Sequence, residues 1–269
     1  MVKPRHVTLS LLGVLFIGAA GSVVLAQQQP STAQSAERER GIQLYEQGDL
    51  KRAVEALRAV VKKNQDDLIA WNYLALALER KGDKKERRKA LSRVADLRIK
   101  LFQKEFDTAG ENMTAADLSR LELLHKEASE SVGNYLGADA APSNLQYWTD
   151  SLNGLIIHGK FLELAKDALA QGRVLRWSEV PKNRARVLKK DEPPYTEEAR
   201  RHQVSGTILL SAIFDADGTI KGIRVVKGLG GGLVEVAIET ARRIKFQPAA
   251  VGGQPVSQYV VIEYSFNVF

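Results

Sequence analysis

The segment IRVVKGLGGGLVEVAIETARR, from Ile223 to Arg243, decides how the last third of the chain folds. A β-branched run enters a loop with four glycines in five positions, and an amphipathic helical pattern follows. Strand, glycine loop and helix is the order in which a phosphate-binding turn begins. The segment therefore fits either a nucleotide site or a plain turn.

The spacing of the glycines excludes a phosphate loop. The dinucleotide pattern G-x-G-x-x-G, started at Gly228 and Gly230, requires a third glycine where the chain has Leu233. No Gly-Lys-Ser or Gly-Lys-Thr sequence follows, so there is no P-loop either. The polar turn at 214–219 joins two strands as a hairpin, whereas nucleotide loops belong to parallel βαβ units. Counted from Asp215, an EF-hand loop lacks its glycine and its glutamate. We therefore expect two turns and no metal.

The residues around these turns predict a small antiparallel sheet with one helix on a face. We expect strands over 204–214 and 220–226, a helix over 233–246 that Pro248 ends, and a long C-terminal strand over 256–269. Alternation places one apolar face of the last strand on Val256, Val260, Ile262, Tyr264, Phe266 and Val268. The predicted layout is ββαβ.

Motifs within residues 181–269 resemble the C-terminal domain of TonB proteins. Those at the start of the domain are Pro193, Tyr195, Ala199, Arg200, Gly206 and Gly218. Those toward its end are Phe246, Pro248, Gly253 and Pro255. The resemblance implies a periplasmic domain of a Gram-negative envelope that transmits inner-membrane energy to outer-membrane transporters. In that family, a short N-terminal segment of the partner pairs in extended form with the final strand.

Residues 37–107 contain a helical repeat. An offset of 34 residues is the tetratricopeptide period. It aligns Gly48-Asp49 with Gly82-Asp83, Leu57 with Leu91, and Val60 with Val94. The pattern over 71–78 also resembles the first helix of that repeat, although a generic pair of helical hairpins is the alternative. We expect Gly48 and Gly82 in the turns between paired helices, and Ala53 where no larger side chain fits.

Residues 108–180 are expected to form a helical extension that covers the end of the repeats. Thr114 with Asp117, and Ser143 with Gln146, resemble capping boxes that open two helices. Trp148 and Trp177 are interpreted as core anchors. The whole chain is therefore predicted to be an α+β protein, with an all-α tetratricopeptide-like domain before the sheet domain.

The N-terminus resembles an export signal. Lys3 and Arg5 precede an apolar run over 7–26, and a polar linker over 27–36 follows. Small residues before the polar segment favour cleavage after Ala26. The alternative is an uncleaved inner-membrane anchor, because the run is about long enough to span a bilayer. Either way, we expect the rest of the chain in the periplasm.

Composition argues against several functional classes. The net charge of +7 comes from basic residues interleaved with acidic ones, which favours a solvated mixed surface over a nucleic-acid site. The chain has no cysteine, and its four histidines lack metal-site spacing. A GxSxG motif and a nucleophile–histidine pattern are also missing from the sequence. We therefore expect no catalytic function and no cofactor.

Three departures from the TonB pattern bear on function. Thr196 follows Tyr195 where the family has proline, and the repeats replace the proline-rich spacer. His6 lies at the edge of the apolar run, so the membrane histidine of the motor-coupled anchor has no counterpart. One hypothesis is an energy transducer for transmembrane transport, working between inner-membrane proton-driven motor proteins and an outer-membrane TonB-dependent transporter. The alternative is a non-transducing scaffold, in which the repeats and the C-terminal domain hold separate partners.

The C-terminal strand is the expected partner-binding site. A final strand at the border of a sheet exposes N–H and C=O groups that pair with an extended peptide. The expected binding residues are Ser257, Gln258, Tyr259, Val260, Val261, Ile262, Glu263 and Tyr264. Two alternatives would cover this edge, namely residues 186–190 and a second copy of the domain in a homodimer.

Overall fold

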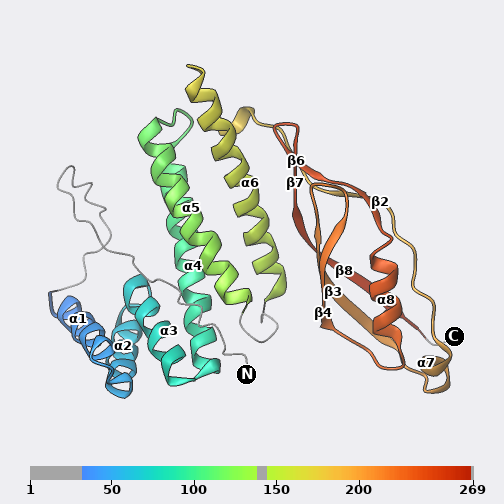
Figure 1. The fold of residues 1–269 in the computed structure, drawn as a ribbon, viewed down its shortest axis with the longest axis horizontal. Coiled ribbons are helices and arrows are strands. Elements are labelled where there is room, and N and C mark those ends of the chain that lie inside the picture. The colour runs from blue at the N-terminus through green and yellow to red at the C-terminus, as the bar shows by residue number, and fades with distance from the viewer. Residues whose placement is uncertain (1–31, 138–143, 268–269) are drawn as a thin grey trace, which may run out of the picture.

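The computed structural model describes residues 32–137 and 144–267, and it shows an α+β protein. Helices α1 to α6 lie on one side of the molecule, and the strands with α7 and α8 lie on the other (Figure 1). Within these ranges, no helix is both long enough and apolar enough to cross a membrane. The predicted export segment, residues 1–26, lies outside the described residues.

The first four helices form two antiparallel hairpins, as the repeat predicts. They are α1 (Thr32–Glu46), α2 (Leu50–Lys63), α3 (Leu68–Lys81) and α4 (Lys84–Ala109). Gly48 and Gly82 lie in the turns with φ of +82° and +79°, a backbone conformation that favours glycine. Asp49 and Asp83 cap the helices that follow by accepting hydrogen bonds from backbone N–H groups. Because α1 begins at Thr32, the segment predicted as a linker over 27–36 is partly helical.

Small residues bring the hairpin helices close together. Ala53 is completely buried in the hydrophobic core that the repeat helices form. A Cβ atom on Gly41 would lie 2.8 Å from the side chain of Leu57, so α1 and α2 are in close contact there. The expectation that Ala53 sits where a larger side chain does not fit agrees with this packing.

Ala53→Leu is expected to destabilise the repeats by about 1–3 kcal/mol, because the added atoms overpack a filled core. The change is measured as the free energy of unfolding in urea. Ala59→Leu is the matched control, because Ala59 is exposed on the same helix and its substitution adds the same atoms in solvent. Equal unfolding midpoints for the two variants would contradict the tight packing at Ala53.

Two long helices, α5 (Ala115–Leu136) and α6 (Leu145–Ala170), extend the helical part. The capping box predicted at Thr114 and Asp117 is confirmed. The second predicted box is not the cap of α6. Its Ser143 lies outside the described residues, and Asn144 caps the helix by accepting from the N–H of Tyr147.

An aromatic cluster fills the space between α4, α5 and α6. Phe102 is fully buried, and its ring lies 5.5 Å from that of His125 and 5.3 Å from that of His158. His158 stacks on Trp177 at 4.7 Å, and burial lowers the pKa of its imidazole. Trp148 is buried against the ring of Tyr135. Both tryptophans interpreted as core anchors therefore pack against the helical core.

The main sheet has the strand order β4-β3-β8, with both pairs antiparallel. Its strands are β3 (Gly206–Phe214), β4 (Ile220–Lys227) and β8 (Gln258–Phe266). Alternate side chains of β3 and β8 point into one core with helix α8 (Leu233–Ala241). The short helix α7 (Glu197–Arg201) contributes Ala199 to the same core. The buried members of β8 are Ile262, Tyr264 and Phe266, as the alternation predicts.

Several predicted boundaries are wrong. The first strand begins at Gly206 instead of residue 204. The helix ends at Ala241 instead of Phe246, because residues Lys245–Gln247 form strand β5, which pairs with β2 (Arg186–Lys189). This pairing buries Phe246 against the ring of Phe214, at 4.2 Å.

The last strand begins at Gln258 instead of Val256. Val256 belongs to β7 (Gln254–Val256), which pairs with β6 (Ala249–Val251), and the chain changes sheets at Ser257.

The β6–β7 hairpin joins the C-terminal part to the helices. Together with β1 (Lys182–Asn183) it forms a separate sheet, which follows the 3-10 turn η1 (Trp177–Glu179). Val251 and Val256 are buried in the same core as Phe161 of α6. A Cβ atom on Gly252 would lie 2.8 Å from the side chain of Leu164, so the hairpin backbone touches α6. The hairpin therefore shares the hydrophobic core of the helices, while the main sheet and α8 form a separate core.

Candidate functional site

The order of the main sheet makes β4 and β8 its edge strands. An edge strand has backbone N–H and C=O groups that its own sheet leaves unpaired, and these groups can pair with another chain. The two edges differ in regularity and in charge. These properties decide which edge suits an incoming strand.

The β4 edge is poorly suited to further pairing. Its register against β3 shifts twice, and Gly222 lies in the left-handed region with φ of +61°. Lys221, Arg224 and Lys227 are exposed along it. Irregular backbone and lysine or arginine side chains are features by which proteins protect sheet edges from pairing.

The β8 edge is regular. Its register against β3 runs without a shift from the Gly206–Phe266 pair to the Phe214–Gln258 pair. In an antiparallel ladder, alternate residues direct both backbone groups toward the same neighbour. The N–H and C=O of Tyr259 point away from β3, toward α6. Val261, Glu263 and Ser265 therefore also direct their backbone groups to the outer edge.

Side chains occupy two places on this outer edge. Asn153 of α6 donates through Nδ2 to the carbonyl of Tyr259, at 2.9 Å, and its Oδ1 accepts from the N–H of Tyr259, at 2.8 Å. Lys190 donates through Nζ to the carbonyl of Glu263, at 2.7 Å. The described residues make no hydrogen bond to the outward groups of Val261 and Ser265, or to the N–H of Glu263. Among the described residues, the stretch from Val261 to Ser265 is therefore open except at the Glu263 carbonyl, and it is called the open stretch below.

The segment at 186–190 lies beside β8 without pairing with its backbone. Its strand, β2, pairs with β5. It is held beside β8 at both ends, because the N–H of Ala185 donates to Gln258 Oε1 at 2.7 Å and Lys190 reaches Glu263. Val187 and Leu188 of β2 are about half exposed, at 48% and 58%. Residues 186–190 were one of the two segments expected to cover this edge. Within them, only the side chain of Lys190 bonds to the outer edge of β8.

The residues predicted to bind a partner do not share one environment. Ile262 and Tyr264 point into the core, and Val260 is partly buried against it. Gln258 is bonded to Ala185, and the hydroxyl of Ser257 accepts from the N–H of Ala216.

The predicted residues that reach the outer edge are Tyr259, Val261 and Glu263. Ser265 joins them on this edge although the prediction omitted it. The same alternation, continued by one more pair of residues, would have included it.

The ring of Tyr264 contacts Lys190 through a cation–π interaction. The ammonium of Lys190 lies 4.4 Å from the centre of the Tyr264 ring. Burial, with the nearby carboxylate of Glu192, raises the pKa of the Tyr264 hydroxyl to about 12. The ring therefore stays neutral at ordinary pH, and a cation lies beside the open stretch.

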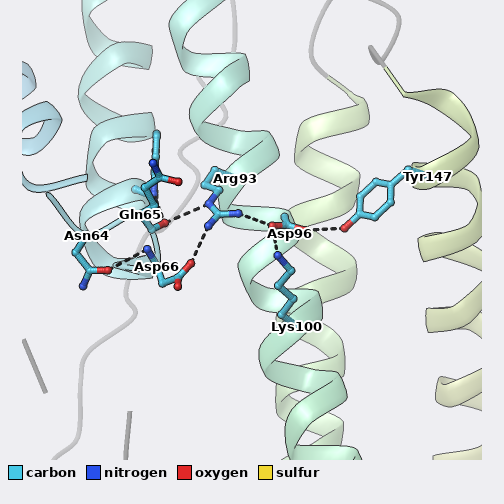
Figure 2. Close-up of polar contacts among 8 residues, drawn as sticks. Asn64, Gln65, Asp66, Arg93, Asp96, Lys100 and Tyr147 are labelled. Carbon is cyan, nitrogen blue, oxygen red and sulfur yellow. Dashed lines mark hydrogen bonds and ion pairs between the residues drawn. The ribbon is translucent and has the colours of Figure 1, made fainter. Parts of the chain in front are cut away.

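A second candidate surface is a cleft of about 730 Å³ where the repeats meet the start of α6. Figure 2 shows its polar network. Arg93 bonds to the carbonyl of Gln65 and to the carboxylates of Asp66 and Asp96, and Asp96 accepts from the hydroxyl of Tyr147 at 2.6 Å. This network fixes the start of α6 on α4.

The charges in the network are well defined. Burial and the bond to Asp96 raise the pKa of Tyr147 to about 12. Although burial opposes its charge, hydrogen bonds from Tyr147 and Lys100 hold the pKa of Asp96 below its usual value. Asp96 is therefore an ionised acceptor and Tyr147 a neutral donor at ordinary pH. Sequence reasoning missed the pair because 51 residues separate its members and neither carries a local signal.

Comparison with known families finds one matching segment in each part of the chain. Residues 38–100 match the family described as tetratricopeptide repeat. Residues 191–268 match the family described as Gram-negative bacterial TonB protein C-terminal. No curated protein matches the sequence. The two matched ranges are those in which the motifs resembled these families.

Proposed function

We propose that this chain, a TonB-like envelope protein that carries a TonB C-terminal domain behind tetratricopeptide repeats, binds an extended segment of an outer-membrane transporter or another envelope protein by strand addition. The observation that carries the proposal is the β8 edge. It is regular over its whole length, and from Val261 to Ser265 the described residues bond to its outward groups only at the Glu263 carbonyl, through Lys190. Backbone pairing along such an edge supplies affinity, and neighbouring side chains supply selectivity.

The sheet itself favours β8 over the opposite edge. A partner strand needs evenly spaced backbone groups, which the two register shifts of β4 disturb. It also gains from apolar neighbours, and the exposed Val187 and Leu188 lie on the segment beside β8. The partner would therefore be an extended segment with apolar side chains toward β2.

Two roles for such binding follow. In the first, the protein transmits inner-membrane energy from motor proteins to a transporter for uptake. In the second, it is a scaffold whose repeats and C-terminal domain hold separate partners, which the distinct cleft on the repeats favours. An uncleaved N-terminal anchor supports the first role. Cleavage supports the second role, or a transducer that works through another subunit. The mass of the mature N-terminus shows whether the anchor is retained. Neither role requires catalysis or a cofactor.

Val261→Pro is expected to weaken strand addition about tenfold to a hundredfold. The substitution removes one outward N–H and places a ring where the partner backbone would lie. The probe is a fluorescein-labelled peptide copied from the periplasmic N-terminal segment of an outer-membrane transporter of the same organism. Its affinity for the full chain is measured by fluorescence anisotropy.

Val261→Ala is the matched control, because it shortens the side chain and keeps the N–H. We expect its affinity within about threefold of the wild type. Circular dichroism establishes that both variants are folded. A folded Val261→Pro variant that binds the peptide as tightly as the wild type would overturn strand addition at β8.

A further inference from the structure

We infer that Asn153 of α6 occupies one position of the β8 edge in place of a partner strand, so that the helical part of the chain restrains its own binding site. The inference rests on the proposed function. An asparagine side chain carries one carbonyl oxygen and one NH₂ group, the same kinds of acceptor and donor as a peptide unit. Asn153 uses both on one residue, Tyr259.

Asn153 with its two hydrogen bonds to Tyr259 is called the clamp below. The clamp and a partner strand cannot both bond to Tyr259. A strand paired with β8 would present its own N–H and C=O to the outward groups of Tyr259. Those groups are already bonded to Asn153, at 2.8 and 2.9 Å. A partner that pairs along the whole edge must therefore displace Asn153. A partner that leaves Asn153 in place can pair only along the stretch from Val261 to Ser265.

Asn153 cannot swing aside as freely as a surface side chain. It lies in the interior of α6, and the β6–β7 hairpin packs on the same helix through Val251 and Val256. Val256 precedes Tyr259 by three residues, so the helix and the start of β8 are held together. Lys190 is different, because its ammonium is carried on a flexible stem and yields easily to a competing donor. Asn153 is therefore the stronger of the two restraints.

The contact between α6 and the sheet is nevertheless incomplete. A cleft of about 790 Å³ lies beside the clamp, and Tyr259, Val260, Leu152 and Ile156 are among its lining residues. The cleft is open to solvent, so the two sides bury less apolar surface against each other there than a fully packed interface would. Separation of α6 from β8 at this point would therefore cost less than separation of two fully packed surfaces.

The clamp couples the two parts of the chain. A strand that displaces Asn153 weakens the hold of α6 on the sheet. A partner of the helical part that moves α6 would likewise make strand binding tighter. By linkage, each of the two partners strengthens the binding of the other by the same factor. The TonB-like domain would then bind most tightly when the helical part is itself engaged.

The test removes the clamp and leaves the edge intact. Asn153→Ala is expected to bind the transporter-segment peptide about tenfold more tightly than the wild type, because the peptide no longer competes with two hydrogen bonds. Alanine also favours a helix more than asparagine does, so α6 should persist. Hydrogen exchange at the amide of Tyr259 should become faster in the free variant. Asn134→Ala, at an exposed position of α5, is the matched control and should change neither property.

The outcomes separate the two proposals. If Val261→Pro abolishes binding while Asn153→Ala leaves affinity and exchange unchanged, strand addition stands and the clamp is overturned. If the peptide binds the wild type, Val261→Pro and Asn153→Ala equally well, strand addition at β8 fails and the clamp fails with it. Tighter binding by Asn153→Ala, with loss in the Val261→Pro variant, supports both.

Discussion

Gly231→Ala is expected to destabilise the C-terminal domain by about 2–5 kcal/mol. Gly231 has φ of +68°, a conformation that costs other residues about 1–2 kcal/mol. An added Cβ would also lie 2.9 Å from the Cα and 3.0 Å from the backbone N of Ala199, in helix α7. Backbone atoms cannot move aside as a flexible side chain can, so overpacking adds to the conformational cost.

The loss is measured by hydrogen exchange of the amides in β3 and α8, with urea unfolding of the full chain. Gly230→Ala is the matched control in the same loop. A Cβ at Gly230 meets no atom within 4 Å, and its φ lies outside the left-handed region. We expect that variant within about 0.5 kcal/mol of the wild type. If the β3 and α8 amides were equally protected from hydrogen exchange in the two variants, α7 would not pack on the loop as described.

Phe102→Ala is expected to destabilise the helical part by about 3–5 kcal/mol, because it leaves a large cavity in a closed aromatic cluster. Phe102 is fully buried among Phe106, His125 and His158. Unfolding in urea is followed by tryptophan fluorescence in a Trp71→Phe background, so that the signal comes from Trp148 and Trp177. Both tryptophans pack on the same core.

Leu123→Ala is the control for this measurement. Leu123 lies on α5 and is 58% exposed, so its truncation removes little buried surface. We expect its unfolding free energy within about 0.5 kcal/mol of the wild type. A Phe102→Ala variant as stable as Leu123→Ala would contradict the aromatic cluster as the centre of the helical core.

The sequence predicted those parts of the fold that depend on local pattern. Glycine and aspartate at a fixed offset predicted the helical turns at Gly48 and Gly82. Alternation predicted the buried face of β8, because a strand held on one side has a period of two. The glycine loop at 228–232 was correctly interpreted as a turn, but the pattern carried no information that Ala199 packs against it.

Predictions failed where distant residues decide the local structure. The helix expected to reach Phe246 ends earlier because β2 pairs with residues Lys245–Gln247. Likewise, Val256 leaves the last strand because it pairs with Ala249. Helical and apolar patterns describe what a segment favours, whereas these boundaries depend on which other segment lies beside it.

The same limit applies to the candidate site. A strand near the end of the chain was expected at a sheet border, and the structure places β8 at an edge. Asn153 lies 106 residues before Tyr259, and nothing in its own helix marks it as a backbone partner. Its place on the edge follows from the packing of α6 against the β6–β7 hairpin. Only the folded chain shows that contact.

The β6–β7 hairpin also has a mechanical consequence. Val251 and Val256 are buried with Phe161 of α6, and β8 begins two residues after Val256. Tension applied along β8 by a bound partner would therefore reach α6 through packed side chains and not through a flexible linker. The β6–β7 hairpin would therefore bear most of the load between the sheet and the helices.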